Sequence, residues 1–255
     1  MPAPIREIAA DERQRSYLLP TRIVRTFGHA ENADSLLSEH PLQIHLNEED
    51  TLLLDNRGSE EKAGVLLDFG RELHGGVRLL GFRPEGAGYP LVRLRFGESI
   101  SEAVTPLGIK GACNDHAVRD FTVPVPLMSD QCWGETGFRF VYIELQEPNA
   151  ALSLRSVLAV YVRRETAQRG TFSCSDPLLD RIFDTAAYTC RLCMQGLLWD
   201  GIKRDRLVWI GDSHPEMLTI RSLFGADPVL ERSLDDICAC TPLPGWMNGM
   251  PSYSL

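Results

Sequence analysis

Residues 171–190 read TFSCSDPLLDRIFDTAAYTC, and the chain changes from one kind of structure to another there. Ser175 and Asp176 favour the N-cap of a helix, and Pro177 suits the first helical turn. Apolar or small residues then recur at the spacing of one helical face: Leu178, Ile182, Ala186, Thr189 and Cys193. The stretch therefore predicts a helix that ends near Gly196.

Upstream of this helix, the sequence contains short strand-like segments with Gly and Pro turns between them. Residues 91–96 alternate between two faces, as a half-buried strand does. The predicted strands are residues 51–55, 65–69, 76–82, 91–96, 121–125, 138–145 and 152–162. Residues 134–137, GETG, predict a hairpin turn. This series, without helices between the strands, predicts an antiparallel β-sandwich over residues 51–165.

Residues 1–50 form an N-terminal extension with a weaker pattern. Residues 16–26 and 42–46 have the composition of short strands. His29, His40 and His45 lie in this region, but no acid or cysteine spacing supports a metal site around them. The sequence therefore predicts neither a metal nor a cofactor.

Downstream, residues 166–255 predict helices only. Ser213 and Glu216 have the spacing of a capping box at the start of a second helix, which Gly225 would end. A third helix is expected from Asp227 or Pro228 to Cys240. Three helices make a small core, so we expect further helices beyond Leu255, and the predicted class is multi-domain, β then α.

Composition restricts the partners and the compartment. The chain has 255 residues, with 26 basic and 35 acidic side chains and a net charge of −9. This balance argues against nucleic acid, whose phosphates require a basic surface. The N-terminus is charged and the sequence lacks an apolar run of membrane-spanning length. With seven scattered cysteines, a reducing cytoplasm is expected, and the sequence leaves a homo-oligomer open.

Residues 199–216, WDGIKRDRLVWIGDSHPE, carry the candidate site. Carboxylates accept hydroxyl hydrogen bonds, arginine donates in fixed directions, and indole rings cover the apolar side of a sugar. The plainer interpretation is a charged, capped helix start. It accounts for Ser213, Glu216 and Asp212, but it leaves other residues of the stretch unexplained: Asp200, Arg204, Asp205 and Trp209.

A family resemblance rests on several of these segments. DGIKRDRLVWIGD, residues 200–212, resembles the signature of bacterial α-L-rhamnosidases (glycoside hydrolase family 78), at the start of their (α/α)6 six-hairpin barrel. Other segments are similar to further parts of the family: LLDFGRELHGGVRL, VRLRFGES and ETGFRFVYIEL to its β-sandwich, TFSCSDPLLDRIFDTAAYTC to its first barrel helix, and GMPSYSL to a later barrel segment.

The resemblance implies an inverting hydrolase of terminal α-L-rhamnosyl linkages, with two carboxyl groups about 6.5–9.5 Å apart. Asp205 falls where the family has its general acid, usually a glutamate. Its shorter side chain departs from that pattern, and Arg204 and Arg206 beside it would lower its pKa, which disfavours an acid role. Asp200, Arg204, Trp209 and Asp212 match positions that hold the rhamnose ring. The general base would lie beyond Leu255, within an incomplete barrel, so this chain alone is expected to be inactive.

The expected partners are rhamnose-containing glycosides or oligosaccharides. Two alternatives stay open at this stage. One is a non-catalytic carbohydrate-binding protein, and the other is a six-hairpin glycosidase that acts on another sugar.

Overall fold

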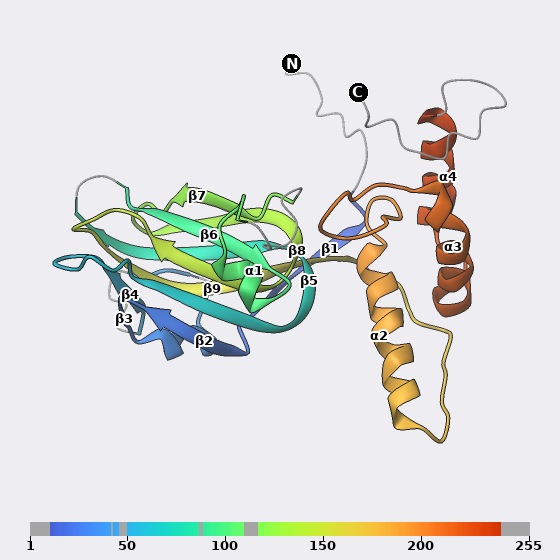
Figure 1. The fold of residues 1–255 in the computed structure, drawn as a ribbon, viewed down its shortest axis with the longest axis horizontal. Helices are drawn as coiled ribbons and strands as arrows, with labels where there is room; N and C mark the ends of the chain where they lie inside the picture. The colour runs from blue at the N-terminus through green and yellow to red at the C-terminus, as the bar shows by residue number, and fades with distance from the viewer. Residues whose placement is uncertain (1–10, 42, 46–49, 87–88, 110–116, 241–255) are drawn as a thin grey trace, which may run out of the picture. The chain divides into compact units, whose positions relative to one another are not determined.

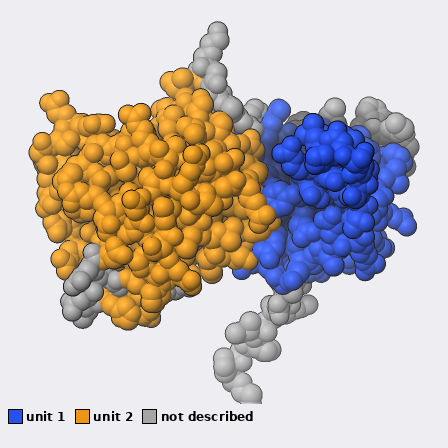
Figure 2. Space-filling view, turned by 90° about the horizontal axis from the view of Figure 1, so that it is seen from below, with its two compact units in different colours: residues 1–15, 162–255 blue, residues 16–161 orange. Residues whose placement is uncertain are grey.

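The structure is a computed structural model, and it describes residues 11–41, 43–45, 50–86, 89–109 and 117–240 (Figure 1). The chain divides into two compact units, which Figure 2 colours separately. One unit contains residues 16–161, and the other contains residues 1–15 and 162–255. The resemblance at residues 249–255 lies outside the described residues.

The larger unit is built on an antiparallel sheet. Its neighbouring strands follow the order β3-β4-β9-β5-β8-β6-β7, with β1 on β9 and β2 on β5. The strands are β1 (Arg13–Leu18), β2 (Arg22–Phe27), β3 (His29–Glu31), β4 (Leu52–Asp55), β5 (Gly64–Glu85), β6 (Leu91–Gly97), β7 (Asp120–Pro124), β8 (Ser129–Leu145) and β9 (Ala151–Arg164). The prediction of antiparallel β structure is confirmed. The expectation of strands without helices between them is wrong in one place, because the short helix α1 (Ile100–Val104) lies between β6 and β7.

In the first fifty residues, the structure differs from the predicted strands. The predicted strand at residues 16–26 corresponds to parts of β1 and β2. The strand predicted at residues 42–46 is wrong over its described part, because residues 43–45 have no strand geometry. A short 3-10 helix, η1 (Ala33–Leu37), precedes them.

β5 joins two segments that the sequence predicted as separate strands. Residues 65–69 and 76–82 both lie in this 22-residue strand. Its first part, Gly64–Asp68, pairs with β2, and its second part, from Gly75 to Glu85, pairs with β9. The pairing with β8 shifts register between Asp68 and Leu73. Because β5 changes partners along its length, its hydrogen bonds connect the strands into one sheet instead of two separate ones.

The hairpin turn predicted at residues 134–137 is also wrong, because these residues lie inside β8. Glycines in this region let the backbones of β5 and β8 come close together. A Cβ at Gly76 of β5 would collide with the carbonyl oxygens of Trp133 and Gly134. Gly134 itself has φ 82°, and its Cβ would lie 3.0 Å from the Phe96 ring. Glycine thus permits a bulge between β5 and β8 instead of a chain reversal.

A buried carboxylate lies where β5 changes partners. The Asp68 side chain is 1% exposed, and it accepts hydrogen bonds from Arg22 Nε at 2.9 Å and Arg139 Nε at 2.8 Å. Burial opposes the charge of Asp68, but the bonds from Arg139, from the Gly70 N–H and from Arg22 lower its pKa to about 2. The charged Asp68 therefore links β2, β5 and β8.

The second unit contains the helices α2 (Pro177–Cys193), α3 (Ile210–Phe224) and α4 (Pro228–Cys240). The predicted start of α2 is confirmed: Asp176 is the N-cap and accepts a hydrogen bond from Leu178 N at 2.9 Å. Gly225 ends α3, as predicted. A shared core joins the helices, formed by Ala187, Met194, Leu198, Ile220, Leu223, Phe224, Val229 and Leu230.

The predicted capping box at Ser213 and Glu216 is wrong. α3 begins one turn earlier, with Trp209 as its N-cap residue. Ser213 lies inside the helix, where its hydroxyl donates to the Trp209 carbonyl at 2.6 Å. Asp212 and Glu216 are therefore one helical turn apart on α3, and neither is needed as a cap.

The described residues show neither a membrane-spanning helix nor a metal-binding cluster. None of their helices combines the length and hydropathy needed to cross a membrane. Likewise, no group of three or more His, Cys, Asp or Glu side chains within the described part has the arrangement to hold a metal ion.

Candidate functional site

The loop between α2 and α3 is closed by its own hydrogen bonds. Asp200 N donates to the Leu207 carbonyl at 2.9 Å, and Leu207 N donates to Asp200 Oδ1 at 3.1 Å. Arg206 adopts a left-handed backbone conformation, with φ 55°, inside this closed segment. Residues 200–207 therefore form a constrained loop that fixes the directions of its side chains.

The same loop is anchored to two helices. Trp199 N donates to the Cys193 carbonyl at 3.0 Å, which ties the loop to the end of α2. Leu198 N donates to Ser233 Oγ of α4 at 2.8 Å, and that hydroxyl donates in turn to the Val229 carbonyl. Groups held on a loop of this kind stay in position because the helices beneath it are packed.

Asp200 has a structural and an electrostatic role in the loop. Burial raises its pKa above the usual value, and the negative charge of Asp205 raises it further, while the Leu207 N–H acts in the opposite direction. The two carboxylates are thus close enough to influence each other. Asp200 is held in place by the bond that closes the loop.

Asp205, the predicted general acid, forms an ion pair with Arg204. Arg204 Nε lies 3.6 Å from Asp205 Oδ1, and the side chains are 62% and 24% exposed, respectively. Arg206 instead lies over the Trp199 ring, 5.8 Å from its centroid. Asp205 is therefore partly shielded from solvent, whereas its partner Arg204 is exposed to solvent.

Trp209 and Asp212 mark the first turn of α3. Trp209 is half-buried, and its carbonyl accepts from Asp212 N at 3.2 Å and Ser213 N at 2.9 Å. Asp212 is exposed. Two of the predicted sugar-holding residues thus lie at the junction of the loop and the helix.

Glu216 interacts electrostatically with Asp200 and Asp212, and we call these three residues the acidic cluster. The sequence interpretation had assigned Glu216 to a helix cap. It is half-buried one turn after Asp212. Burial raises its pKa to about 7, and the negative charges of Asp212 and Asp200 contribute. The four-residue spacing from Asp212 would have revealed this placement if the helix start had been set at Trp209.

Two cysteines of α2 lie near Glu216. Burial raises the pKa of Cys193 to about 12, and the charge of Glu216 adds to the effect; burial also raises the pKa of Cys190. Both thiols therefore stay protonated at neutral pH. Protonated, half-buried thiols are poor nucleophiles and metal ligands, so their role is packing between α2 and α3.

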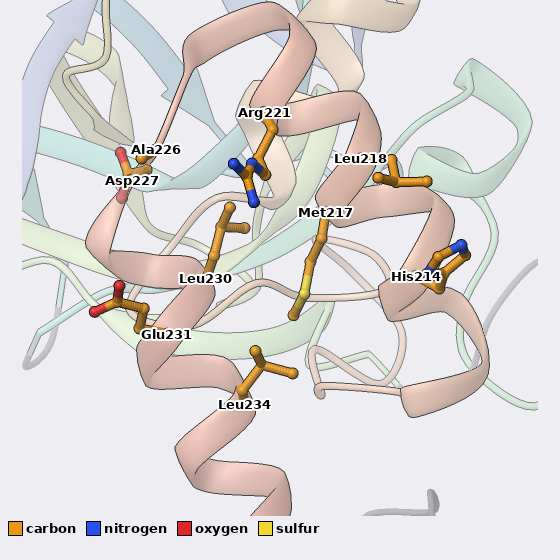
Figure 3. Close-up of a pocket in the computed structure, with 9 residues that line it drawn as sticks. All are labelled: His214, Met217, Leu218, Arg221, Ala226, Asp227, Leu230, Glu231 and Leu234. Carbon is orange, nitrogen blue, oxygen red and sulfur yellow. The ribbon is translucent and has the colours of Figure 1, made fainter.

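A groove lies between α3 and α4 (Figure 3). It has a volume of about 390 Å³ and contains Met217, Leu230 and Leu234 between the two helices. On α3, the groove residues follow a different side of the helix from Asp212 and Glu216, as the 3.6-residue period requires. None of the predicted site residues lines the groove. The groove is therefore distinct from the acidic cluster.

Comparisons with known proteins agree with the resemblance. Residues 167–253 match the family model described as the bacterial α-L-rhamnosidase six-hairpin glycosidase domain. No curated protein gives a significant match to the chain.

Solved structures of similar fold include three rhamnosidases. The enzyme from Klebsiella oxytoca with rhamnose bound has 22% identity and a TM-score of 0.67 over 89% of this chain. The family 78 rhamnosidase of Bacillus sp. GL1 has 20% identity and a TM-score of 0.63 over 82%. The Streptomyces avermitilis α-L-rhamnosidase complexed with L-rhamnose has 22% identity and a TM-score of 0.50 over 69%.

The chain spans 44%, 20% and 17% of the lengths of these three proteins, respectively. At these identities the structural matches establish a common fold. Together with the family model, they confirm the resemblance to bacterial family 78 α-L-rhamnosidases that the sequence indicated. The segment matched by the family model includes the closed loop and α3.

Proposed function

We propose that this chain is part of an inverting α-L-rhamnosidase-like glycoside hydrolase, with Asp205 as its proton donor. The observation that carries the proposal is the closed loop of residues 200–207, which holds the partly buried Asp205 inside the segment matched by the family model. The roles of Asp200, Arg204, Trp209 and Asp212 follow from their chemistry and from the resemblance.

The proposed reaction uses Asp205 in its protonated form. Its carboxyl proton is transferred to the glycosidic oxygen while the bond from that oxygen to the anomeric carbon breaks. A water molecule attacks the opposite face of that carbon, and a second carboxylate takes its proton. Asp200 and Asp212 accept hydrogen bonds from sugar hydroxyls, Arg204 donates one, and Trp209 packs on the apolar side of the ring.

We further propose that the chain corresponds to the N-terminal part of such an enzyme, including an incomplete (α/α)6 barrel. The supporting observation is that it spans less than half of each rhamnosidase compared. In this proposal the general base lies outside residues 1–255, and the chain alone has little or no turnover. We also propose a cytoplasmic location and a division of the chain into three parts: residues 1–50, 51–165 and 166–255.

The test is release of nitrophenol from its α-L-rhamnoside by a full-length enzyme that contains these residues. Asp205→Asn should lower kcat/KM by about 10² to 10⁴, the usual contribution of a positioned general acid. Asp235→Asn, at an exposed position of α4, is the matched control. An unchanged rate for Asp205→Asn rejects the acid assignment, and retention of the anomeric configuration rejects inversion.

A non-catalytic sugar-binding protein is the second candidate. The groups around the loop are of the kinds that bind sugars, and no general base is assigned among the described residues. A non-catalytic sugar-binding protein would have the same features. Calorimetry with rhamnose, together with a panel of aryl glycosides, separates the candidates. Binding without hydrolysis supports the second candidate, and cleavage of another glycoside supports a six-hairpin enzyme of different specificity.

A further inference from the structure

The larger unit contains a pocket that the proposed hydrolase does not use. Its volume is about 390 Å³, within the range of about 300–1,000 Å³ typical of small-molecule sites. Three parts of the chain form its wall: residues 17–19 at the end of β1, residues 39–40 after η1, and Ser156 and Leu158 of β9. We name it the β1–β9 pocket, after the strand pair that forms one side.

The wall formed by residues 39–40 is held in place from both ends. The His40 ring nitrogen Nε2 lies 3.0 Å from the Ser35 carbonyl, and Arg155 Nε donates to the Pro41 carbonyl at 3.3 Å. Because a carbonyl only accepts, Nε2 must carry the proton, and Nδ1 of a neutral ring is an acceptor. The pocket is therefore preformed, with an oriented imidazole in its wall.

The pocket contains polar groups that a ligand can reach. Ser156 is 4% exposed, and within the described residues its hydroxyl makes no hydrogen bond. The Glu39 carboxylate and the Tyr17 hydroxyl likewise make no hydrogen bond to the side chains and backbone that the structure describes. The Ser156 hydroxyl is not among the buried atoms that lack a hydrogen bond, so solvent reaches it, and it can donate to or accept from a ligand in the pocket.

The remaining lining is apolar and aromatic. Leu18, Leu19 and Leu158 contribute alkyl surface, and Tyr17 contributes a ring that is 45% exposed. The Arg78 guanidinium stacks on that ring, 4.6 Å from its centroid, and Arg78 Nε donates to Asp130 at 2.7 Å. Arg78 therefore fixes the ring and is itself neutralised by Asp130.

The lining chemistry selects the ligand class. The described residues that line the pocket include a carboxylate but neither lysine nor arginine, which disfavours phosphates and carboxylates. A lining of hydroxyl, carboxylate and imidazole groups together with aromatic and aliphatic side chains suits a neutral polyhydroxylated ring. We propose that the β1–β9 pocket is a second, non-hydrolytic binding site for a neutral saccharide unit, in which Glu39 and Ser156 bind its hydroxyls.

The test is calorimetry on the chain of residues 1–255 with methyl α-L-rhamnoside, methyl α-D-glucoside and the diamine putrescine as probes. Glu39→Gln and Ser156→Val should each weaken saccharide binding about tenfold, the effect of losing one strong hydrogen bond. Glu60→Gln, at another exposed glutamate of the same unit, should leave binding unchanged. Thermal melting verifies folding, and the exposed Glu39 keeps the test valid if Ser156→Val is unstable.

The outcomes separate this site from the proposed hydrolase site. Saccharide binding that survives Asp212→Asn but falls in Glu39→Gln supports the β1–β9 pocket. An absence of saccharide binding, or binding insensitive to both pocket variants, overturns it. Putrescine binding that Glu39→Gln removes, without saccharide binding, also overturns it by identifying a cation site. The pocket variants should leave hydrolysis by a full-length enzyme unchanged.

Discussion

Carboxylates of the sheet and carboxylates around the loop of residues 200–207 behave in opposite ways. In the sheet unit, Asp68, Asp120 and Asp130 are paired with arginines, and their pKa values lie below the usual range. In the helical unit, burial and neighbouring acids raise the pKa values of Asp200 and Glu216. Glu216, with a pKa of about 7, can exchange a proton near neutral pH, whereas the arginine-paired acids stay charged and support the fold.

Asp120 is an example of a carboxylate that is paired with an arginine. Arg93 forms a bidentate contact with it, with Nε at 2.6 Å and Nη2 at 2.7 Å from its two oxygens. Burial opposes the charge of Asp120, but these bonds more than compensate, so its pKa is lowered. This geometry gives directional stabilisation and leaves little capacity to move a proton.

Asp68→Asn should have the largest effect on stability. At pH 7 we expect a loss of about 2 kcal/mol, because the native carboxylate has a pKa of about 2 against 3.8 in the unfolded chain. A lowered pKa stabilises the fold above pH 3.8, and the contribution disappears as the pH falls towards 2. Urea unfolding at pH 7 and pH 2.5 measures this difference.

The matched control for that variant is Asp34→Asn, at an exposed position of η1. It should change stability little at either pH. An equal loss for Asp68→Asn at both pH values would contradict the electrostatic explanation and indicate a packing defect instead.

Glu216→Gln should act in the opposite direction and more weakly. The pKa of Glu216 rises from 4.5 to about 7 on folding, so its ionisation costs stability as the pH rises through that interval. The groups that face it are Asp212 of α3, Asp200 of the loop, and Cys190 and Cys193 of α2. Allowing for its partial exposure, we expect the variant to gain about 1.5 kcal/mol at pH 8 relative to pH 4.

Urea unfolding of Glu216→Gln at these two pH values is the measurement. Asp235→Asn, an exposed acid in α4, should show no such pH-dependent gain. If Glu216→Gln also behaves like this control, Glu216 is solvated and the contrast between the two groups of carboxylates is smaller than the structure indicates.

Asp176→Ala should have the smallest effect of the three, a loss of about 1 kcal/mol from removing the N-cap of α2. Thermal unfolding measures it, and Asp176→Ser should retain most of the stability because serine also caps. Equal losses for the alanine and serine variants would show that the Asp176 charge, and not the capping bond, is what matters.

Local signals in the sequence predicted the parts of the fold that local contacts decide. Asp176 and Pro177 begin α2 because the cap bonds a neighbouring N–H. Ser213 and Glu216 fit a cap equally well, but α3 begins at Ile210, so both lie inside the helix, where the Ser213 hydroxyl donates to the Trp209 carbonyl. Gly76 resembles a turn residue, although its role is close contact with a strand almost sixty residues away, which the local pattern does not contain.

The sequence named the candidate-site residues, and their roles stay predictions. The motif identified Asp200, Arg204, Asp205, Trp209 and Asp212, and the structure places them on one closed loop and the adjoining helix turn. It did not reveal that the Asp200 carboxylate closes that loop. Glu216 was missed because its place in the cluster depends on where α3 begins.

The change of partners along β5 has a consequence for biosynthesis. β5 ends at Glu85, but β8 and β9, which pair with it, begin at Ser129 and Ala151. Pairing between such distant segments is slow to form, and strand edges without partners favour aggregation. We therefore expect nascent chains arrested before β9 to be degraded rapidly by protease and to require chaperone protection, and chains that extend through β9 to resist. Equal resistance of both would show that β5 folds without its late partners.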